Sequence, residues 1–428
     1  MNTAQNKTIE EFNQEGNFIV VTPYPVMKDG KMYNVTGVAT YSYHLTPHLA
    51  EHLNKIGKKL IILCDKKDNN SQVVQDNVLI IPVWDRGDKK IYSQILRGLG
   101  LFNKVSNVLI HFEFNMYGEA FTTGFFPLFL LRIRKKNTTL LLHQVAKDLT
   151  SLQGHLGIRN KIKLKILDFL HHWFYYFLLK FSDKIIVHDQ VLKERLLGIS
   201  KKTVFVVPHG LGEYQNNCAL IDARETLGIK KKSFVVLCFG FLTWYKGSDW
   251  IVDKVIEFNK KFGKTNLELI MAGGPSANLK DKDFYKVFYD DLLEKIKPYE
   301  NIRITGFISD EEVHYYYCSS DVVVLPYRTQ MSASGPFAVA MSFDRPFLLS
   351  KNLSGVLETY DIKKAMSEIG FESSDLLFDM EGNDFFKKLS LLQEDKKKLK
   401  KMALLSAKVA EARQWKNISE KFVTIVDA

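Results

Sequence analysis

The chain opens with short apolar runs that alternate with amphipathic stretches. Residues 18–22 (FIVVT) form the first run and residues 59–64 (KLIILC) the next. Between them, apolar side chains recur at helical spacing: Tyr43, Leu45, Leu49 and Leu53. Strand, helix and strand in this order begin a doubly wound parallel sheet. The next apolar runs predict further strands at 78–83, 108–112, 139–143, 184–188 and 204–208.

The pattern restarts after the polar stretch 212–217. Apolar runs predict strands at 234–239, 267–272, 302–305, 322–325 and 347–350, and a helix is expected over 248–262. An amphipathic helix closes the chain. We therefore expect an α/β fold with two Rossmann-like domains facing each other across a cleft, over residues 1–210 and 211–409, and a terminal helix over 410–428.

Composition adds a preference for anionic partners. The 428 residues hold 59 Lys and Arg against 48 Asp and Glu, a formal net charge of +11. Such an excess favours nucleotide diphosphates, lipid headgroups or nucleic acid, although a solvated lysine-rich surface is the better account of most individual lysines. The four cysteines form no CxxC pair, which predicts neither a zinc site nor a disulfide framework and fits a reducing compartment.

Targeting signals are not evident. The first residues are polar, unlike a signal peptide, and the longest apolar runs, 125–131 and 173–179, fall short of the ~20 residues that span a bilayer. We expect a cytoplasmic protein, soluble or peripheral. A P-loop motif, zinc-finger spacing and an RNP-like sequence are absent from the sequence, so ATP hydrolysis on a P-loop and nucleic-acid binding are not expected.

The segment 239–247 (FGFLTWYKG) joins a predicted strand to a predicted helix. Gly240 would let a phosphate approach the backbone, and the helix that follows favours anions at its N-terminus. Lys246 would add a positive charge beside a diphosphate. A simple strand–turn–helix with a surface lysine is the alternative. We favour a phosphate site.

The segment 332–336 (SASGP) precedes a second predicted helix. Ser332, Ser334 and Gly335 would present hydroxyl and amide groups to an anion. An ordinary serine N-cap accounts for one serine but not for the glycine as well.

Three positions in the first domain are candidates for the facing side of the cleft. Gly37 precedes the first long helix and would let a diphosphate or an acceptor come close, or is simply a loop glycine with positive φ. His111 and Glu113 share one face of a strand, which faces solvent or the cleft, and would position a sugar or transfer a proton. His143, at the end of the next strand, would join them.

Residues 161–180 (KIKLKILDFLHHWFYYFLLK) combine lysines with a run of aromatic side chains. This composition suits a helix lying at an anionic membrane surface. A core helix with lysines reaching to solvent is at least as consistent with it.

Taken together, these segments resemble the GT-B retaining glycosyltransferases of family four. The similarity lies in their order: GVATYSYHLTPHLAEHL, SDKIIVHDQVLKERL, VFVVPHG, FGFLTWYKG, MAGGP, NIRITGFISDEEVHYYYCSSDVVVLPYR and ARQWKNISEKFVTIV. The resemblance implies a terminal helix that crosses back to an acceptor-side first domain. It places Lys246, Ser334 and Gly335 at the donor diphosphate, Gly37 near the phosphate or acceptor, and Phe307 and Ile308, after Gly306, near the base.

Three departures accompany the resemblance. Met331 and Val339 occupy the places of two glutamates that relatives often carry, and an arginine usual near Lys246 is missing. Phe112 stands where many relatives have a histidine before Glu113.

The family would transfer a hexose from a UDP- or GDP-sugar to a glycan or lipid-linked acceptor in envelope polysaccharide synthesis, with retention and without a metal or other cofactor. The alternative is a non-catalytic subunit that binds a partner glycosyltransferase or a glycan.

Overall fold

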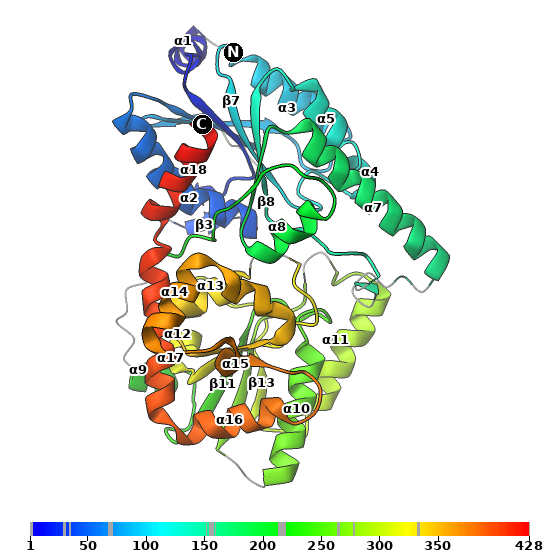
Figure 1. The fold of residues 1–428 in the computed structure, drawn as a ribbon, viewed down its shortest axis with the longest axis vertical. Coiled ribbons are helices and arrows are strands. Elements are labelled where there is room, and N and C mark those ends of the chain that lie inside the picture. The colour runs from blue at the N-terminus through cyan, green and yellow to red at the C-terminus, as the bar shows by residue number, and fades with distance from the viewer. Residues whose placement is uncertain are drawn as a thin grey trace.

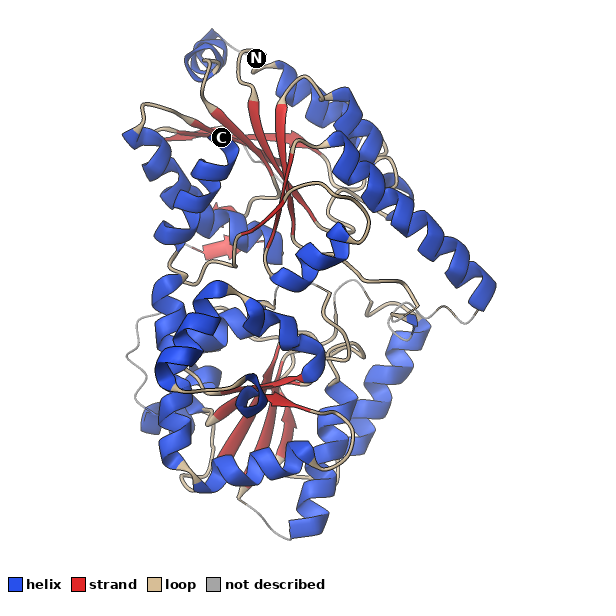
Figure 2. Cartoon of the chain, viewed as in Figure 1, coloured by secondary structure: helices blue, strands red, loops and turns tan. Residues whose placement is uncertain are grey.

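The structure is a computed structural model and describes residues 3–28, 31–33, 36–66, 72–150, 152–153, 158, 160–212, 220–262, 266–276, 279–331 and 334–427. It contains two α/β domains, each a sheet with helices on both faces (Figures 1 and 2). This is the predicted fold class.

The sheet of the first domain has the order β10-β9-β8-β7-β1-β4-β6-β5, and every neighbouring pair but β5–β6 is parallel. Its strands are β1 (Phe18–Val21), β4 (Leu60–Asp65), β5 (Val73–Gln75), β6 (Val78–Trp84), β7 (Asn107–Phe112), β8 (Asn137–Leu142), β9 (Lys184–Val187) and β10 (Val204–Val206). Its helices are α1 (Thr3–Phe12), α2 (Gly37–Lys55), α3 (Ile91–Gly100), α4 (Ala120–Thr123), α5 (Phe126–Arg132), α7 (Lys161–Phe181) and α8 (Gln190–Leu197). A hairpin, β2 (Val26–Lys28) and β3 (Lys31–Tyr33), stands apart from the sheet.

The sheet of the second domain is parallel throughout, with the order β13-β12-β11-β14-β15-β16. Its strands are β11 (Phe234–Phe239), β12 (Leu267–Ala272), β13 (Ile302–Ile304), β14 (Val322–Leu325), β15 (Phe347–Ser350) and β16 (Leu377–Phe378). The helices around it are α9 (Leu220–Thr226), α10 (Ser248–Phe262), α11 (Asp283–Ile296), α12 (Val313–Ser319), α13 (Gly335–Ser342), α14 (Tyr360–Ile369), α15 (Ser373–Leu376), α16 (Asp384–Glu394) and α17 (Lys396–Ala412), with the 3₁₀ helix η1 (Lys351–Glu358).

The predicted strands are present because each is a buried apolar run, covered by helices on both faces. Their ends agree with the observed bounds within two residues. Sequence reasoning missed the elements that are not such runs, namely the exposed edge strand β5, the β2–β3 hairpin and the two-residue β16.

The chain closes with α18 (Trp415–Asp427), which leaves the second domain and packs beside α2 of the first (Figure 1). One face of α18 is buried in the core of the first domain: Trp415, Ile418, Phe422 and Val426. Because these side chains recur at helical spacing, a single apolar stripe meets that core. The predicted crossover helix is therefore present.

The two connections between the domains touch where the chain crosses. Leu211 N–H donates to the carbonyl oxygen of Arg413, with a nitrogen–oxygen distance of 2.8 Å. A β-carbon on Gly210 would lie 2.3 Å from the ring of Trp415, so only glycine allows this crossing. The guanidinium of Arg413 forms a buried ion pair with Asp361, which fixes the second connection to α14.

The structure also bears on the expectations about cysteines and about membrane-spanning segments. Cys64 and Cys238 are buried thiols, whereas Cys318 is disulfide-bonded, a bond that the expectation of no disulfide framework did not anticipate. Cys218 lies outside the described residues. Within the described ranges, no helix has the length and apolar content needed to cross a membrane.

The crossover helix yields a stability prediction. Phe422 is fully buried in the core of the first domain, so Phe422→Ala is expected to lower the free energy of unfolding by about 3–5 kcal/mol, as for other buried aromatic truncations. Denaturant unfolding followed by circular dichroism measures it. Lys421→Ala, at an exposed position of the same helix, serves as the control. Equal stability of the two variants would mean that α18 is not part of the first domain's core.

Candidate functional site

Glycines shape the loops at the carboxyl ends of the strands in the second domain. Gly240 follows β11 with φ of 101°, and Gly247 closes the same loop with φ of 71°. Glycine alone adopts such values without strain. A β-carbon on Gly247 would lie 2.0 Å from the carbonyl oxygen of Pro326, and one on Gly273 would lie 2.1 Å from that of Gly240. The loops after β11, β12 and β14 therefore pack backbone against backbone.

Lys246 lies above the backbone of Gly240. Its Nζ is 3.0 Å from the position that a β-carbon of Gly240 would take and 6.0 Å from the ring centroid of Tyr327. Burial lowers the pKa of Lys246 to about 8, and within the described part of the chain no charge offsets that effect. A half-buried cation without a counter-charge is a site where an anionic ligand gains most, because the ligand supplies the missing charge.

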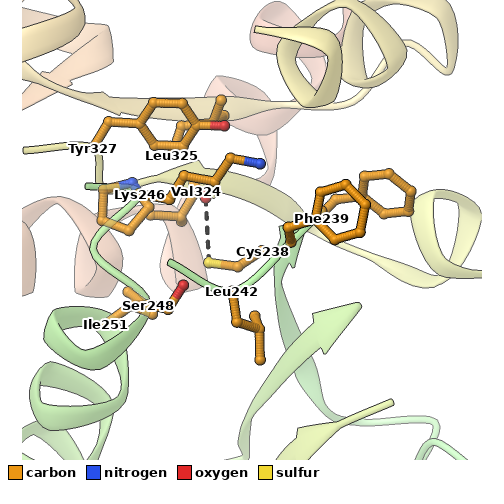
Figure 3. A pocket seen from close by; sticks show the side chains of 12 residues that line it. Cys238, Phe239, Leu242, Lys246, Ser248, Ile251, Val324, Leu325 and Tyr327 are labelled. Carbon is orange, nitrogen blue, oxygen red and sulfur yellow. Dashed lines mark hydrogen bonds between the residues drawn. The ribbon is translucent and has the colours of Figure 1, made fainter. Parts of the chain in front are cut away.

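A cavity of about 20 Å³ lies between this loop and the end of β14, which is room for about one water molecule. Gly240, Lys246, Pro326 and Tyr327 are among its lining residues. Figure 3 shows the Lys246 side chain running alongside the ring of Tyr327. The volume is too small for a nucleotide, so the cavity forms only one wall of the candidate site.

Ser334 and Gly335 begin α13 beside this wall. The Ser334 hydroxyl caps the helix by accepting from Phe337 N–H at 3.3 Å, and it lies 3.2 Å from the hydroxyl of Tyr327. Nothing lies within 4 Å of the place where a β-carbon of Gly335 would stand. The cap reading of Ser334 is thus confirmed, and Tyr327 joins it to Lys246. Ser332 lies outside the described residues.

The loop after β13 forms the next part of the same edge. Gly306 has φ of 78°, Ile308 is buried, and the Phe307 side chain is 81% exposed. A β-carbon on Gly274 would lie 3.0 Å from the Phe307 nitrogen, so the glycine after β12 lets this loop approach. Phe307 therefore offers an uncovered ring face at the carboxyl edge of the sheet.

Gly37 occupies the start of α2 in the first domain. Thr36 is the N-cap, its side chain accepting from Ala39 N–H at 3.3 Å, and Gly37 is the first helical residue. Its φ lies outside the left-handed region, which rules out the alternative of a positive-φ loop glycine. A β-carbon there would meet nothing within 4 Å. Open space in front of a helix N-terminus leaves room for an anion.

His111 is fully buried, and not on the solvent or cleft face that strand alternation predicted. It heads a chain of imidazoles formed at consecutive strand ends. His111 Nδ1 lies 3.3 Å from His143 Nε2, and His143 Nδ1 lies 3.1 Å from His188 Nε2. His188 Nδ1 lies 3.0 Å from the carbonyl oxygen of Val207. The expected joining of His143 to His111 is confirmed, but beneath the surface.

The contact between His188 and a carbonyl oxygen determines which ring nitrogens of the three histidines donate. A carbonyl oxygen only accepts, so His188 donates from Nδ1 and accepts at Nε2, and one consistent assignment has His143 and His111 each donating from Nδ1 as well. His111 Nε2 then has no partner among the described residues. Burial lowers the pKa of His111 to about 3 and of His188 to about 3, so the rings are neutral. Sequence reasoning missed His188 and His209, although each follows a strand as the other two do.

Glu113 lies just beyond the end of β7 and is partly buried. Burial raises its pKa to about 7, an effect that the charge of Arg86 reduces. The carboxyl group in turn contributes to the raised pKa of Tyr245 in the second domain. Since Tyr245 precedes Lys246, the Glu113 carboxyl group lies within electrostatic range of the glycine-shaped loop of the second domain. Of these two candidates, His111 lies inside β7 and is fully buried, whereas Glu113 follows the strand and lies near this loop.

The two domains are also tied together beside this loop. Arg195 Nη1 donates to the carbonyl oxygens of Val145 at 2.5 Å and of Gln330 at 2.7 Å. The Gln330 side-chain amide donates to Asp189 at 2.6 Å, and Val145 N–H donates to the carbonyl oxygen of Met331 at 3.0 Å. The main-chain carbonyl of Met331 thus serves as a contact between the two domains.

Within the described ranges, no group of three or more His, Cys, Asp or Glu side chains has the arrangement of a metal site.

Comparison with known proteins identifies this architecture. Residues 233–372 match the family model for glycosyl transferases group 1. An uncharacterised glycosyltransferase of Methanocaldococcus jannaschii is 24% identical over 192 residues, 41% of this chain and 44% of that protein. The match thus spans less than half of that relative's length.

Two solved structures are similar over nearly the whole chain. Sucrose-phosphate synthase from Thermosynechococcus elongatus has a TM-score of 0.65 at 15% identity, covering 97% of this chain and 98% of that one. The Anabaena protein HepE, solved in complex with UDP and glucose, has a TM-score of 0.60 at 12% identity, covering 97% and 99%. At identities this low, the structural similarity establishes only the fold, which is GT-B.

The raised pKa of Glu113 makes a pH prediction. The folded state holds this proton up to about pH 7, whereas the unfolded chain releases it near the ordinary pKa of about 4.3. The group therefore contributes stability that is present at acid pH and is lost as the pH rises through about 7. The free energy of unfolding, measured in denaturant across this range, should fall more steeply with pH in the unmodified protein than in Glu113→Gln. Glu119→Gln, at an exposed site nearby, should behave as the unmodified protein does; a pH dependence that Glu113→Gln leaves unchanged would contradict the assignment.

Proposed function

We propose that this GT-B chain, whose second domain matches glycosyl transferases group 1, transfers a hexose from a UDP- or GDP-sugar to a glycan or lipid-linked acceptor. One observation carries the proposal. Lys246 is a half-buried cation without a compensating charge in the described structure, held against a glycine loop at the carboxyl edge of a parallel sheet. Ligands of doubly wound sheets bind at this edge, and a diphosphate is the anion such a loop accommodates.

The diphosphate would become the leaving group of the transfer. As the glycosidic bond breaks, negative charge grows on its oxygens, and donors already in place stabilise that charge without reorganising. Lys246 supplies a positive charge, the backbone at Gly240 allows close approach, and the N-terminus of α13 at Ser334 and Gly335 supplies a favourable dipole. With these cationic and dipolar groups, we propose that the reaction requires no metal. Retention of configuration is part of the same proposal.

Phe307 and Ile308 would flank the nucleotide base. The exposed ring of Phe307 offers a stacking face, and the open backbone at Gly306 leaves room beside it. From the first domain, the N-terminus of α2 at Gly37 would face the donor phosphate or the acceptor. Each side of the cleft would thus contribute one helix N-terminus.

Glu113 is our candidate for proton transfer or for positioning the sugar. A carboxyl group with a pKa of about 7 is suited to exchange a proton at neutral pH. His111 has a lowered pKa and no exposed surface, so any part it plays would run through the residues that cover it.

A second candidate is a non-catalytic GT-B subunit that binds a partner glycosyltransferase or a glycan. It is favoured by Met331 and Val339, which occupy the places of the two glutamates that relatives often carry. This candidate and the enzyme differ in whether bound donor is turned over.

Calorimetric titration with UDP, GDP and ADP tests the donor site. We expect one of the three to bind, and Lys246→Met to weaken that binding by about 1.5–3 kcal/mol, since it removes a charged partner but keeps the methylene chain. Lys260→Met, at an exposed position of α10, is the matched control. Unchanged affinity in Lys246→Met would remove Lys246 from the site, and no binding of any nucleotide by the folded protein would favour the non-catalytic subunit.

Turnover of the matching nucleotide sugar tests the role of Glu113. Glu113→Gln keeps the shape of the side chain but removes its titrating proton, so kcat should fall by about 10²–10⁴, as for a general acid or base. Nucleotide affinity should stay within twofold. Glu119→Gln is again the control. Full activity of Glu113→Gln would exclude proton transfer by this residue.

A further inference from the structure

The first half of α7 leaves an apolar face uncovered. Five large side chains are exposed there: Ile162 (72%), Ile166 (56%), Phe169 (63%), Leu170 (55%) and Trp173 (42%). Successive helical residues are about 100° apart around the axis. These five positions therefore fall within one arc of roughly 100°. The exposure forms a stripe rather than scattered surface residues.

The second half of the same helix belongs to the core. Tyr175, Leu178 and Leu179 are fully buried, and the ring of Phe174 packs against Phe112 at 5.6 Å between centroids. Figure 1 shows α7 projecting from this packed end, so that its beginning stands clear of the first sheet. Both interpretations of this segment are therefore partly right: α7 is a core helix toward its end and has an exposed apolar face toward its start.

The charges around the stripe are of one sign. Lys161, Lys163 and Lys165 are exposed on the first turns, with Lys163 and Lys165 on opposite sides of the apolar arc. Asp168, the acidic residue of α7, accepts a hydrogen bond from Leu149 N–H at 2.7 Å and is turned toward the body of the protein. Among the described residues of α7, the apolar stripe is flanked by exposed lysines, which makes it complementary to an anionic surface with an apolar interior.

Neighbouring helices extend the apolar surface. Phe121 (75% exposed), Phe125 (44%) and Leu128 (55%) lie on α4, α5 and the turn between them, and α5 packs beside α7. Large exposed apolar groups on adjoining elements mark an interaction surface.

We propose that the outer face of α7 docks on the surface of an anionic lipid bilayer, with the apolar stripe below the headgroups and the lysines among them. The helix would lie in the plane of the membrane. Membrane docking does not require the proposed transferase function. Only the inference about the acceptor, given below, rests on that function.

The connection into α7 links docking to the cleft. Val145, early in this connection, donates to the carbonyl oxygen of Met331 in the second domain, and Leu149, further along it, is bonded to Asp168 of α7. The membrane-bound helix and the cleft edge near Ser334 are thus joined through a short tethered segment. Docking through α7 would hold the cleft close to the bilayer, which favours a lipid-linked acceptor over a free glycan.

Vesicle sedimentation of the full chain tests the docking. The unmodified protein should bind vesicles of phosphatidylglycerol mixed with phosphatidylcholine, at least tenfold more weakly when phosphatidylglycerol is left out or when salt is raised. Phe169→Ser combined with Trp173→Ser should weaken binding at least tenfold. Leu391→Ser combined with Leu404→Ser removes two comparably exposed apolar side chains of the second domain and should bind as the unmodified protein does.

A fluorescence measurement separates insertion from loose adsorption. Trp173 is an exposed tryptophan in the stripe, so vesicles should shift tryptophan emission to shorter wavelength. Trp173→Phe should keep vesicle binding and lose that shift.

Nucleotide titration of each variant gives a readout independent of lipid. Normal nucleotide binding with absent vesicle binding overturns the docking alone, whereas vesicle binding without nucleotide binding overturns the proposed function alone. If the double variant at Phe169 and Trp173 binds vesicles as tightly as the unmodified protein, the proposal is also overturned. So does a lipid-free dimer that this variant abolishes, since the face would then join two copies of the chain.

Discussion

The close packing of backbone at the carboxyl edge of the second sheet is the constraint on which the candidate site depends. Gly247 fits against the Pro326 carbonyl, and Gly273 against that of Gly240, at distances that a β-carbon would not allow. This packing brings Lys246 over Gly240 and beside Tyr327. The ammonium group is thereby desolvated without a counter-charge in the described structure. The proposed anion-binding site therefore depends on the fit of these loops as well as on Lys246.

The first domain contains a cluster of histidines close to this edge. The rings of four histidines, located at or just beyond strand ends, pack around Tyr41, which also contacts the crossover residue Trp415. Since these rings are neutral and packed edge to face, they act as a polar extension of the core. Glu113, just beyond His111, is held by the same strand end but lies near the glycine-shaped loop. The buried His111 and the partly buried carboxyl group of Glu113 thus lie two residues apart, at the end of β7 and just beyond it.

The contacts between domains lie close to the proposed donor site. Arg195 and Gln330 fasten the loop that precedes Ser334, while Arg413, Asp361 and Trp415 fix the two crossing connections. Motion of one domain relative to the other would have to break or reshape these hydrogen bonds. The proposed donor site and the segment that leads into α7 therefore depend on the same contacts between the domains.

The sequence by itself determined the two parallel sheets, the crossover helix and the phosphate-site candidates Gly240, Lys246 and Ser334, because these depend on local patterns. Apolar runs specify buried strands, and a glycine or serine between strand and helix specifies a turn or a cap. Adjacent strand ends predicted that His143 would join His111, but the contacts of Tyr327 with Ser334 and Lys246 were not predicted, since they join separate loops. Only the tertiary structure decided that His111 is covered while Glu113 lies near the glycine-shaped loop, and that α7 is core at one end and uncovered at the other. The physical reason is that alternation fixes which side of a strand or helix a residue occupies, whereas packing decides what covers that side.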